Sequence, residues 1–287
     1  MSVRTSGGCG TRVVVSHGIM TQRVGVIGLG TMGKVLARGI LDHRLAAVAG
    51  STRSRASAER ASAELGIPVE IDNLALAARS DVLLLCAKPY QARAIVEKLA
   101  PALEERHVLV SICAAISLDD LAAWSGGHAA IVRAMPNTPC LVGEGMTVLA
   151  ACANLPDEQL ETVRKLFETL GRTAVVDESL MDGVTGLSGC GPAYVYLIIE
   201  ALSEAGVKLG IPRKTATLLA AQTLLGSAKM VLERGIHPAA LKDEVTTPAG
   251  CTIDGLMALE EGRLRSTLIG AVVAAANRSR TLREPVA

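Results

Sequence analysis

Residues 23–33 read RVGVIGLGTMG, and this stretch decides the fold. An apolar run ends in a GxGxxG turn, and the pattern KVLARGIL that follows it is typical of a helix. Strand, glycine turn and helix in this order predict a dinucleotide-binding unit, in which the glycines allow a tight turn, close approach of a pyrophosphate and close helix packing. The helix N-terminus offers free amides to the phosphates. We therefore expect cofactor contacts at Gly28, Leu29, Gly30, Thr31, Met32 and Gly33.

The loop after the second apolar run, residues 46–50, indicates which nicotinamide cofactor is bound. Enzymes that use NAD usually place an acidic residue here, which accepts from the ribose 2′-hydroxyl. This chain instead has the sequence STRSR, which is Ser51, Thr52, Arg53, Ser54 and Arg55. Guanidinium and hydroxyl groups suit a 2′-phosphate. We expect NADP(H) as cofactor, with NAD(H) accepted less well; a solvated basic loop without a ligand is the alternative.

Further apolar runs divide the chain into two domains. They lie at 81–86, 107–112, 130–134, 145–150 and 172–176, with helical patterns between the early ones, which predicts a parallel sheet covered by helices. After about residue 177 only helices are predicted, at 191–209, 212–234, 237–244, 252–261 and 263–282. The fold class is therefore α/β: residues 1–20 form a loose extension, 21–177 a Rossmann domain and 178–287 an all-helical domain.

The composition of the helical part and of the whole chain limits the class of partner. The helices carry apolar residues on more than one face, which predicts an oligomer interface, with a compact monomeric bundle as the alternative. The formal net charge is +1 and aromatic residues make up 2%, so we expect neither nucleic acid nor a membrane as partner. Seven scattered cysteines without a CxxC spacing favour the reducing cytoplasm and no metal site.

A second candidate site lies in residues 242–255, KDEVTTPAGCTIDG. Pro248 fixes a turn, Gly250 and Cys251 leave room, and a helix is expected to start near Thr252. Bare amides at a helix N-terminus bind a carboxylate, and the Thr252 hydroxyl lies beside them. Thr252 as an N-cap alone is the structural alternative. Thr247 either lines the same pocket or is a solvated turn residue.

Four motifs resemble those of pyrroline-5-carboxylate reductases. They are SGCGPAYVYLIIEALSEAGV at 188–207, MPNTP at 135–139, AKP at 87–89 and the segment 241–261, and the resemblance runs from about residue 22 to residue 282. It implies a Rossmann domain and a helical dimerisation domain in a 6-phosphogluconate dehydrogenase-like arrangement. It also implies a homodimer as the minimum unit, commonly assembled into a decamer. The implied activity, as an oxidoreductase, is reduction of L-1-pyrroline-5-carboxylate to L-proline by NADPH, the final step of proline biosynthesis.

The resemblance also implies roles for single residues. Thr252 is the expected catalytic residue, because in the family the equivalent threonine faces the substrate nitrogen. Two chain positions depart from the family pattern: Cys190 stands where serine is frequent, and Ala249 where glycine is frequent. The implied substrate contacts are Val245, Thr247, Gly250, Cys251 and Thr252, and the further cofactor contacts are Ser51, Thr52, Arg53, Asn73, Cys86, Ala87 and Lys88.

Several alternatives stay open at this point. The chain could reduce another cyclic imine carboxylate, or bind NADP as a non-catalytic sensor. A β-hydroxyacid reductase would need a catalytic lysine in the helical part, and no lysine there lies in a matching motif. Lys88 is either a general acid or part of a turn that places backbone near the nicotinamide; we favour the turn. We expect surface or helix-end positions for His43, His107, His128 and His237.

Overall fold

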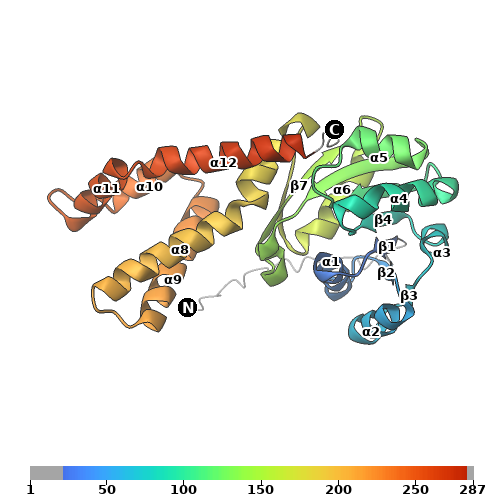
Figure 1. The fold of residues 1–287 in the computed structure, drawn as a ribbon, viewed down its shortest axis with the longest axis horizontal. Helices are drawn as coiled ribbons and strands as arrows, with labels where there is room; N and C mark the ends of the chain where they lie inside the picture. The colour runs from blue at the N-terminus through green and yellow to red at the C-terminus, as the bar shows by residue number, and fades with distance from the viewer. Residues whose placement is uncertain (1–21, 283–287) are drawn as a thin grey trace, which may run out of the picture.

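A computed structural model describes residues 22–282, so the expected extension at 1–20 lies outside the described residues. The described chain has two parts, a sheet covered by helices and a long helical arm that projects from it (Figure 1). The last strand ends at Val175, and helical turns begin at Glu178. A domain boundary near residue 177 remains a prediction that agrees with this change of structure.

The described residues form an eight-stranded sheet in the order β3-β2-β1-β4-β5-β6-β7-β8. The pairs from β2 to β6 are parallel, as predicted, and the short edge strand β3, which was not predicted, is parallel to β2. β7 is antiparallel to β6, which was not predicted. The reason is the short connection between them, because a parallel crossover needs about a dozen residues or more. The bounds are β1 Arg23–Ile27, β2 Ala47–Ser51, β3 Val69–Glu70, β4 Val82–Leu85, β5 Val108–Ser111, β6 Ala130–Met135, β7 Gly145–Ala151 and β8 Gly171–Val175.

Helices cover both faces of the sheet, which explains why the strands read as unbroken apolar runs. Alternate residues of β4 belong to opposite hydrophobic clusters. Leu84 packs with residues of α1 and α6, whereas Leu83 and Leu85 pack with residues of α4 and α5. The helices of this part are α1 Thr31–Asp42, α2 Arg55–Leu65, α3 Asn73–Ala78, α4 Pro89–Leu99, α5 Leu118–Ser125 and α6 Asp157–Glu168, with 3₁₀ turns η1 Ala100–Ala102 and η2 Thr138–Val142.

The helical arm follows the predicted helices closely. Each of the five predicted helices begins and ends within one residue of the expected bounds. A π-helix, η4, precedes the first of them and was not predicted. The bounds are η3 Glu178–Leu180, α7 Met181–Val184, η4 Thr185–Gly189, α8 Gly191–Lys208, α9 Arg213–Arg234, α10 Pro238–Glu244, α11 Cys251–Glu261 and α12 Leu264–Thr281.

Much apolar surface of the arm lies exposed in a single chain. Leu197 and Leu218 are each 65% exposed, and Ile269 is 64% exposed. α9 is long and apolar enough to cross a membrane by length and composition, although only 11% of its most apolar window is buried. The arm is therefore no compact bundle on its own, and its apolar residues are available to a second chain.

His107 departs from the expected surface position. Its side chain is completely buried, and both ring nitrogens have backbone partners. Nδ1 accepts the N–H of Glu104 at 2.9 Å, and Nε2 lies 3.1 Å from the Ala77 carbonyl oxygen. These two partners satisfy the ring and make burial tolerable. His237 does occupy a helix end, where it accepts the N–H of Ala239 as the N-cap of α10.

Candidate active site

The glycine turn after β1 has the geometry that a dinucleotide site requires. Gly28 has φ of +94°, and its N–H donates to the Ser51 carbonyl oxygen at 3.0 Å. A Cβ atom at Gly28 would lie 2.9 Å from the Cys86 carbonyl oxygen, and one at Gly33 would lie 2.2 Å from the Gly28 carbonyl oxygen. Both positions therefore require glycine, the first for the turn and the second for close packing of α1 on β1.

Gly30 differs from its two neighbours because it faces open space. A Cβ atom there would meet no described atom within 4 Å. Gly30 is the N-cap of α1, without a side-chain capping bond and without an acidic residue in the first turn of the helix. The first amides of α1 are thus left to a ligand, and the helix dipole favours an anion. These residues fit the pyrophosphate of a dinucleotide.

The expected 2′-phosphate end is built from the loops after β2 and β3. Ser51 is buried, and its hydroxyl donates to Oδ1 of Asn73 at 2.6 Å. The Thr52 N–H donates to the Glu70 carbonyl oxygen at 2.9 Å. The structure therefore brings together Ser51 and Asn73, which lie 22 residues apart in the sequence. The exposed Arg53 guanidinium forms no ion pair with any described residue and remains available to an anion.

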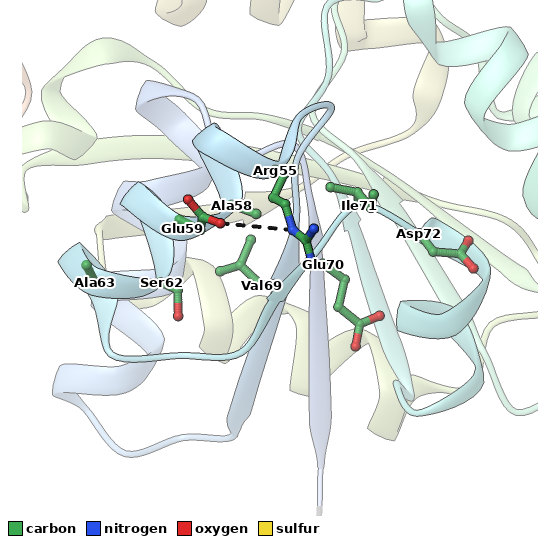
Figure 2. A pocket seen from close by; sticks show the side chains of 9 residues that line it. All are labelled: Arg55, Ala58, Glu59, Ser62, Ala63, Val69, Glu70, Ile71 and Asp72. Carbon is green, nitrogen blue, oxygen red and sulfur yellow. Dashed lines mark ion pairs between the residues drawn. The ribbon is translucent and has the colours of Figure 1, made fainter.

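An open groove of about 950 Å³ runs along α2 and the edge strand β3 (Figure 2). Its upper end reaches the loops of the expected 2′-phosphate site. There the Arg55 side chain lies beside Glu59, with a nitrogen–oxygen distance of 4.0 Å. Two further carboxylates of the groove already have partners, since Glu70 pairs with Arg79 and Asp72 accepts the N–H of Leu74. Among the residues that line the groove, Arg55 is therefore the main group that could bind an anion.

The expected nicotinamide end lies where β4 gives way to α4. The Cys86 N–H donates to the Ile27 carbonyl oxygen at 2.8 Å, which fixes this end of β4 against the glycine turn. Burial, with a smaller contribution from Cys113, raises the pKa of Cys86 well above its usual range. Lys88 is the N-cap residue of α4, and its exposed ammonium group forms no ion pair with a described residue. The structure thus leaves both interpretations of Lys88 open.

The expected substrate turn lies between α10 and α11. α11 begins at Cys251 with Gly250 as its N-cap, and no side chain caps it. The interpretation of Thr252 as an N-cap is therefore wrong, because Thr252 is the second residue of the helix. Its half-buried hydroxyl makes no hydrogen bond to a described residue. That hydroxyl and the first amides of α11 are free to bind a ligand.

The turn itself has a tight backbone. The Gly250 N–H donates to the Thr247 carbonyl oxygen at 3.0 Å, and a Cβ atom at Gly250 would lie 2.3 Å from the Thr247 hydroxyl oxygen. Ala249 has φ of +56°, in the left-handed region that glycine adopts without strain. Glycine would therefore suit the Ala249 position better than alanine does. Val245, Thr247 and Cys251 are all exposed around the turn.

Within a single chain, the expected cofactor residues and the expected substrate residues do not lie together. Figure 1 shows α10 and α11 at the end of the arm, remote from α1 and β1. The cofactor residues are gathered at one edge of the sheet, and the substrate residues around one turn of the arm. Among residues 22–282, no group of three or more His, Cys, Asp or Glu side chains could hold a metal ion.

Asn137 links the sheet to the arm, and no role was predicted for it. Its side-chain amide donates to the Ser188 carbonyl oxygen of η4 at 3.1 Å and accepts the Met146 N–H at 2.9 Å. A Cβ atom at Gly189 would lie 2.7 Å from the Met135 methyl carbon, so η4 presses directly on the end of β6. The motif MPNTP at 135–139 was the available sequence signal, and π-helices of this kind are frequent at functional sites.

Comparisons with known proteins agree with this arrangement. Residues 178–282 match the family model for pyrroline-5-carboxylate reductase dimerisation, and residues 23–115 match that for NADP oxidoreductase, coenzyme F420-dependent. The chain is 41% identical to pyrroline-5-carboxylate reductase of Arabidopsis thaliana over 91% of this chain and 95% of that protein. The corresponding enzyme of Synechocystis is 42% identical over 92% of this chain and 99% of its own.

Solved structures give the same result. The pyrroline-5-carboxylate reductase of Coxiella burnetii superposes with a TM-score of 0.88 at 33% identity, covering 92% of this chain and 100% of that chain. The pyrroline carboxylate reductase of Plasmodium falciparum, solved with NADP bound, superposes with a TM-score of 0.82 at 33% identity, covering 93% and 100%. The chain belongs to the pyrroline-5-carboxylate reductase family.

Proposed function

We propose that this protein reduces L-1-pyrroline-5-carboxylate to L-proline with NADPH as hydride donor. The observation that carries the proposal is a pair of uncapped helix N-termini in a chain of this family. α1 offers its amides at the glycine turn, and α11 offers its amides beside the free Thr252 hydroxyl. The first suits a pyrophosphate and the second a substrate carboxylate.

We propose further that each active site contains residues of two chains. The substrate turn and the glycine turn lie apart in one chain, so a hydride cannot pass between ligands bound to them. The apolar surface of the arm is exposed, and the family model that matches the arm is one for dimerisation. A second chain that covers this surface would bring its substrate turn to the nicotinamide edge of the first. Decamers built from such dimers, which the family resemblance implies, are part of this proposal.

In this reaction the protein contributes mainly by binding and orienting the two reactants. NADPH, when bound, supplies the hydride that adds to the imine carbon. The ring nitrogen carries a proton from water and becomes the secondary amine of proline. The α11 amides hold the carboxylate, and the Thr252 hydroxyl hydrogen-bonds the ring nitrogen. Holding the two reactants in contact lowers the barrier by several kcal/mol.

The cofactor preference follows from the loop after β2. Arg53 is unpaired and exposed beside the hydroxyls of Ser51 and Thr52, which favours the 2′-phosphate of NADPH over the free hydroxyl of NADH. The six described cysteines are all free thiols, which fits the cytoplasm.

The reaction is tested by following NADPH oxidation with pyrroline-5-carboxylate, pyrroline-2-carboxylate and the six-membered piperideine carboxylates. Rapid turnover of pyrroline-5-carboxylate and slow turnover of the others is the expected result. Preference for another imine would refute the substrate. NADPH binding without turnover of any imine would indicate a sensor.

A complementation experiment tests the two-chain site. Gly30→Ala impairs the cofactor half and Thr252→Ala the substrate half, so each homodimer should be nearly inactive. Co-expression of the two variants should restore activity to about a quarter of the wild-type value. Half of randomly formed dimers are heterodimers, and each of these has one site without either change. Activity that stays at the level of the single variants would place both halves in one chain.

A further inference from the structure

The loop after β5 contains a buried thiol that contacts the expected nicotinamide edge. Cys113 is 3% exposed, and its Sγ donates to the Ala87 carbonyl oxygen at 3.3 Å. The Cys113 N–H donates to the hydroxyl of the buried Ser111 at 3.2 Å. Cys113 was not predicted as a site residue. A side chain of the loop after β5 thus fixes the backbone just beyond β4.

The segment of Cys86 and Ala87 is held from its other side by the glycine turn. A Cβ atom at Gly28 would lie 2.9 Å from the Cys86 carbonyl oxygen and 3.4 Å from the Ala87 nitrogen. A Cβ atom at Gly33 would lie 3.2 Å from the Cys86 Cβ. This segment is therefore enclosed between the pyrophosphate turn and the Cys113 thiol. A shift of the segment would therefore affect both the pyrophosphate and the nicotinamide half of a bound dinucleotide.

The hydrogen bond to Cys113 determines the direction of one free backbone donor. In a trans peptide group the C=O and the following N–H point in opposite directions. Because the Ala87 carbonyl points to Cys113, the Lys88 N–H points away from it. That N–H donates to no described residue, and Lys88 itself is exposed. A free amide donor is thus held at the edge where β4 ends.

Two further features of the loop support this role. Ala115 has φ of +61°, a left-handed conformation that is strained for alanine and that such loops retain mainly near functional sites. Burial raises the pKa of Cys113, so the side chain remains a protonated thiol and a hydrogen-bond donor at neutral pH.

We propose that Cys113 is a positioning residue for the nicotinamide end of the cofactor. Through the Ala87 carbonyl it orients the Lys88 N–H, which donates to the nicotinamide ribose or carboxamide of bound NADPH. Cys113 itself touches no reactant. The proposal rests on the proposed function, and it adds a residue outside the motifs that carry the family resemblance.

The test compares variants that remove the donor with one that keeps it. Cys113→Ala and Cys113→Val remove the donor with different side-chain volumes, and Cys113→Ser retains one. The matched control is Cys152→Ala, because the half-buried Cys152 also has a backbone partner, the Ile131 N–H at 3.1 Å. Cys152 follows β7 at the opposite edge of the sheet, remote from the nicotinamide end.

Both donor-free variants should lower kcat about tenfold per NADPH-binding site, while the Kd of NADPH in a calorimetric titration changes less than about twofold. The reason is that misplacing a reactant by a fraction of an ångström slows hydride transfer more than it weakens binding. The deuterium isotope effect on kcat with 4-deuterated NADPH should rise, because hydride transfer becomes more rate-limiting. The serine variant should keep at least about half of the wild-type kcat, and the Cys152 control all of it.

Four results would overturn the inference. The first three are wild-type kcat in both donor-free variants, a serine variant as slow as they are, and an equal loss in the Cys152 control. A loss of kcat with an unchanged isotope effect also contradicts positioning and indicates damage to the fold. If the wild-type protein binds NADPH but does not reduce pyrroline-5-carboxylate, the proposed function fails instead, and the two failures are distinguishable.

Discussion

Replacing Gly30 with alanine should weaken NADPH binding strongly and leave the fold intact. Gly30 has φ of −77° and ψ of −165°, which any residue adopts, and a Cβ atom there meets nothing within 4 Å. The folded chain thus accepts alanine without strain. Alanine restricts the unfolded chain, which raises the free energy of unfolding by about 0.4–1 kcal/mol, but it is a poorer N-cap than glycine, so the two effects roughly cancel.

The same Cβ atom occupies the space in front of the α1 amides, where a pyrophosphate must approach. Moving the phosphate outward by about 1 Å lengthens its hydrogen bonds, and a bond to a charged group contributes about 1.5–3 kcal/mol. A total loss of about 3 kcal/mol raises the Kd of NADPH about 100-fold. Stability should therefore stay close to the wild-type value while cofactor affinity falls.

The measurements are a calorimetric NADPH titration and thermal unfolding of the apoprotein. Two glycine variants serve as controls. In Gly33→Ala the Cβ atom would lie 2.2 Å from a carbonyl oxygen, so both stability and binding should fall. Gly66 has φ of +70° and open space around it, so Gly66→Ala should lower stability alone. Wild-type NADPH affinity in Gly30→Ala would refute a pyrophosphate site at this turn.

Four further changes test other parts of the molecule. Thr252→Ala should lower kcat/KM for the imine about 100-fold while the dimer and its thermal unfolding stay unchanged, because the hydroxyl has no partner in the fold; a serine variant as slow as alanine would contradict this. Arg53→Gln should raise the KM for NADPH about tenfold and leave that for NADH unchanged, as steady-state kinetics with both cofactors would show. Ala249→Gly should raise the free energy of unfolding by about 0.5–1 kcal/mol, since it relieves a left-handed alanine, and denaturant unfolding measures it. The hydrogen bond from Arg23 lowers the pKa of Asp81, so the ion pair stabilises the fold above the ordinary aspartate pKa, and this contribution is lost as pH falls through the lower pKa of the folded state. In Asp81→Asn the free energy of unfolding should therefore depend less on pH below about pH 4. The same pH dependence as in the wild type, measured by denaturant unfolding at acidic pH, would contradict a contribution from this pair.

Local pattern was sufficient to predict most elements of this fold. Each long arm helix was expected within one residue of its bounds, because apolar periodicity and turn residues act over short distances. The role of the GLGTMG turn could be predicted for the same reason, since the requirement for glycine depends on the backbone conformation and on nearby atoms. The edge strand β3, with two residues, is too short to carry a period and was missed.

Long-range packing decided the rest, and no local pattern encodes it. The short connection after β6 turned β7 antiparallel, and two backbone partners made the burial of His107 tolerable. The bond between Cys113 and Ala87 joins residues 26 positions apart, so no spacing rule could reveal it. The separation of the glycine turn from Thr252 is likewise a property of the whole chain, because the direction of the arm depends on packing between distant segments and not on the local pattern of each helix.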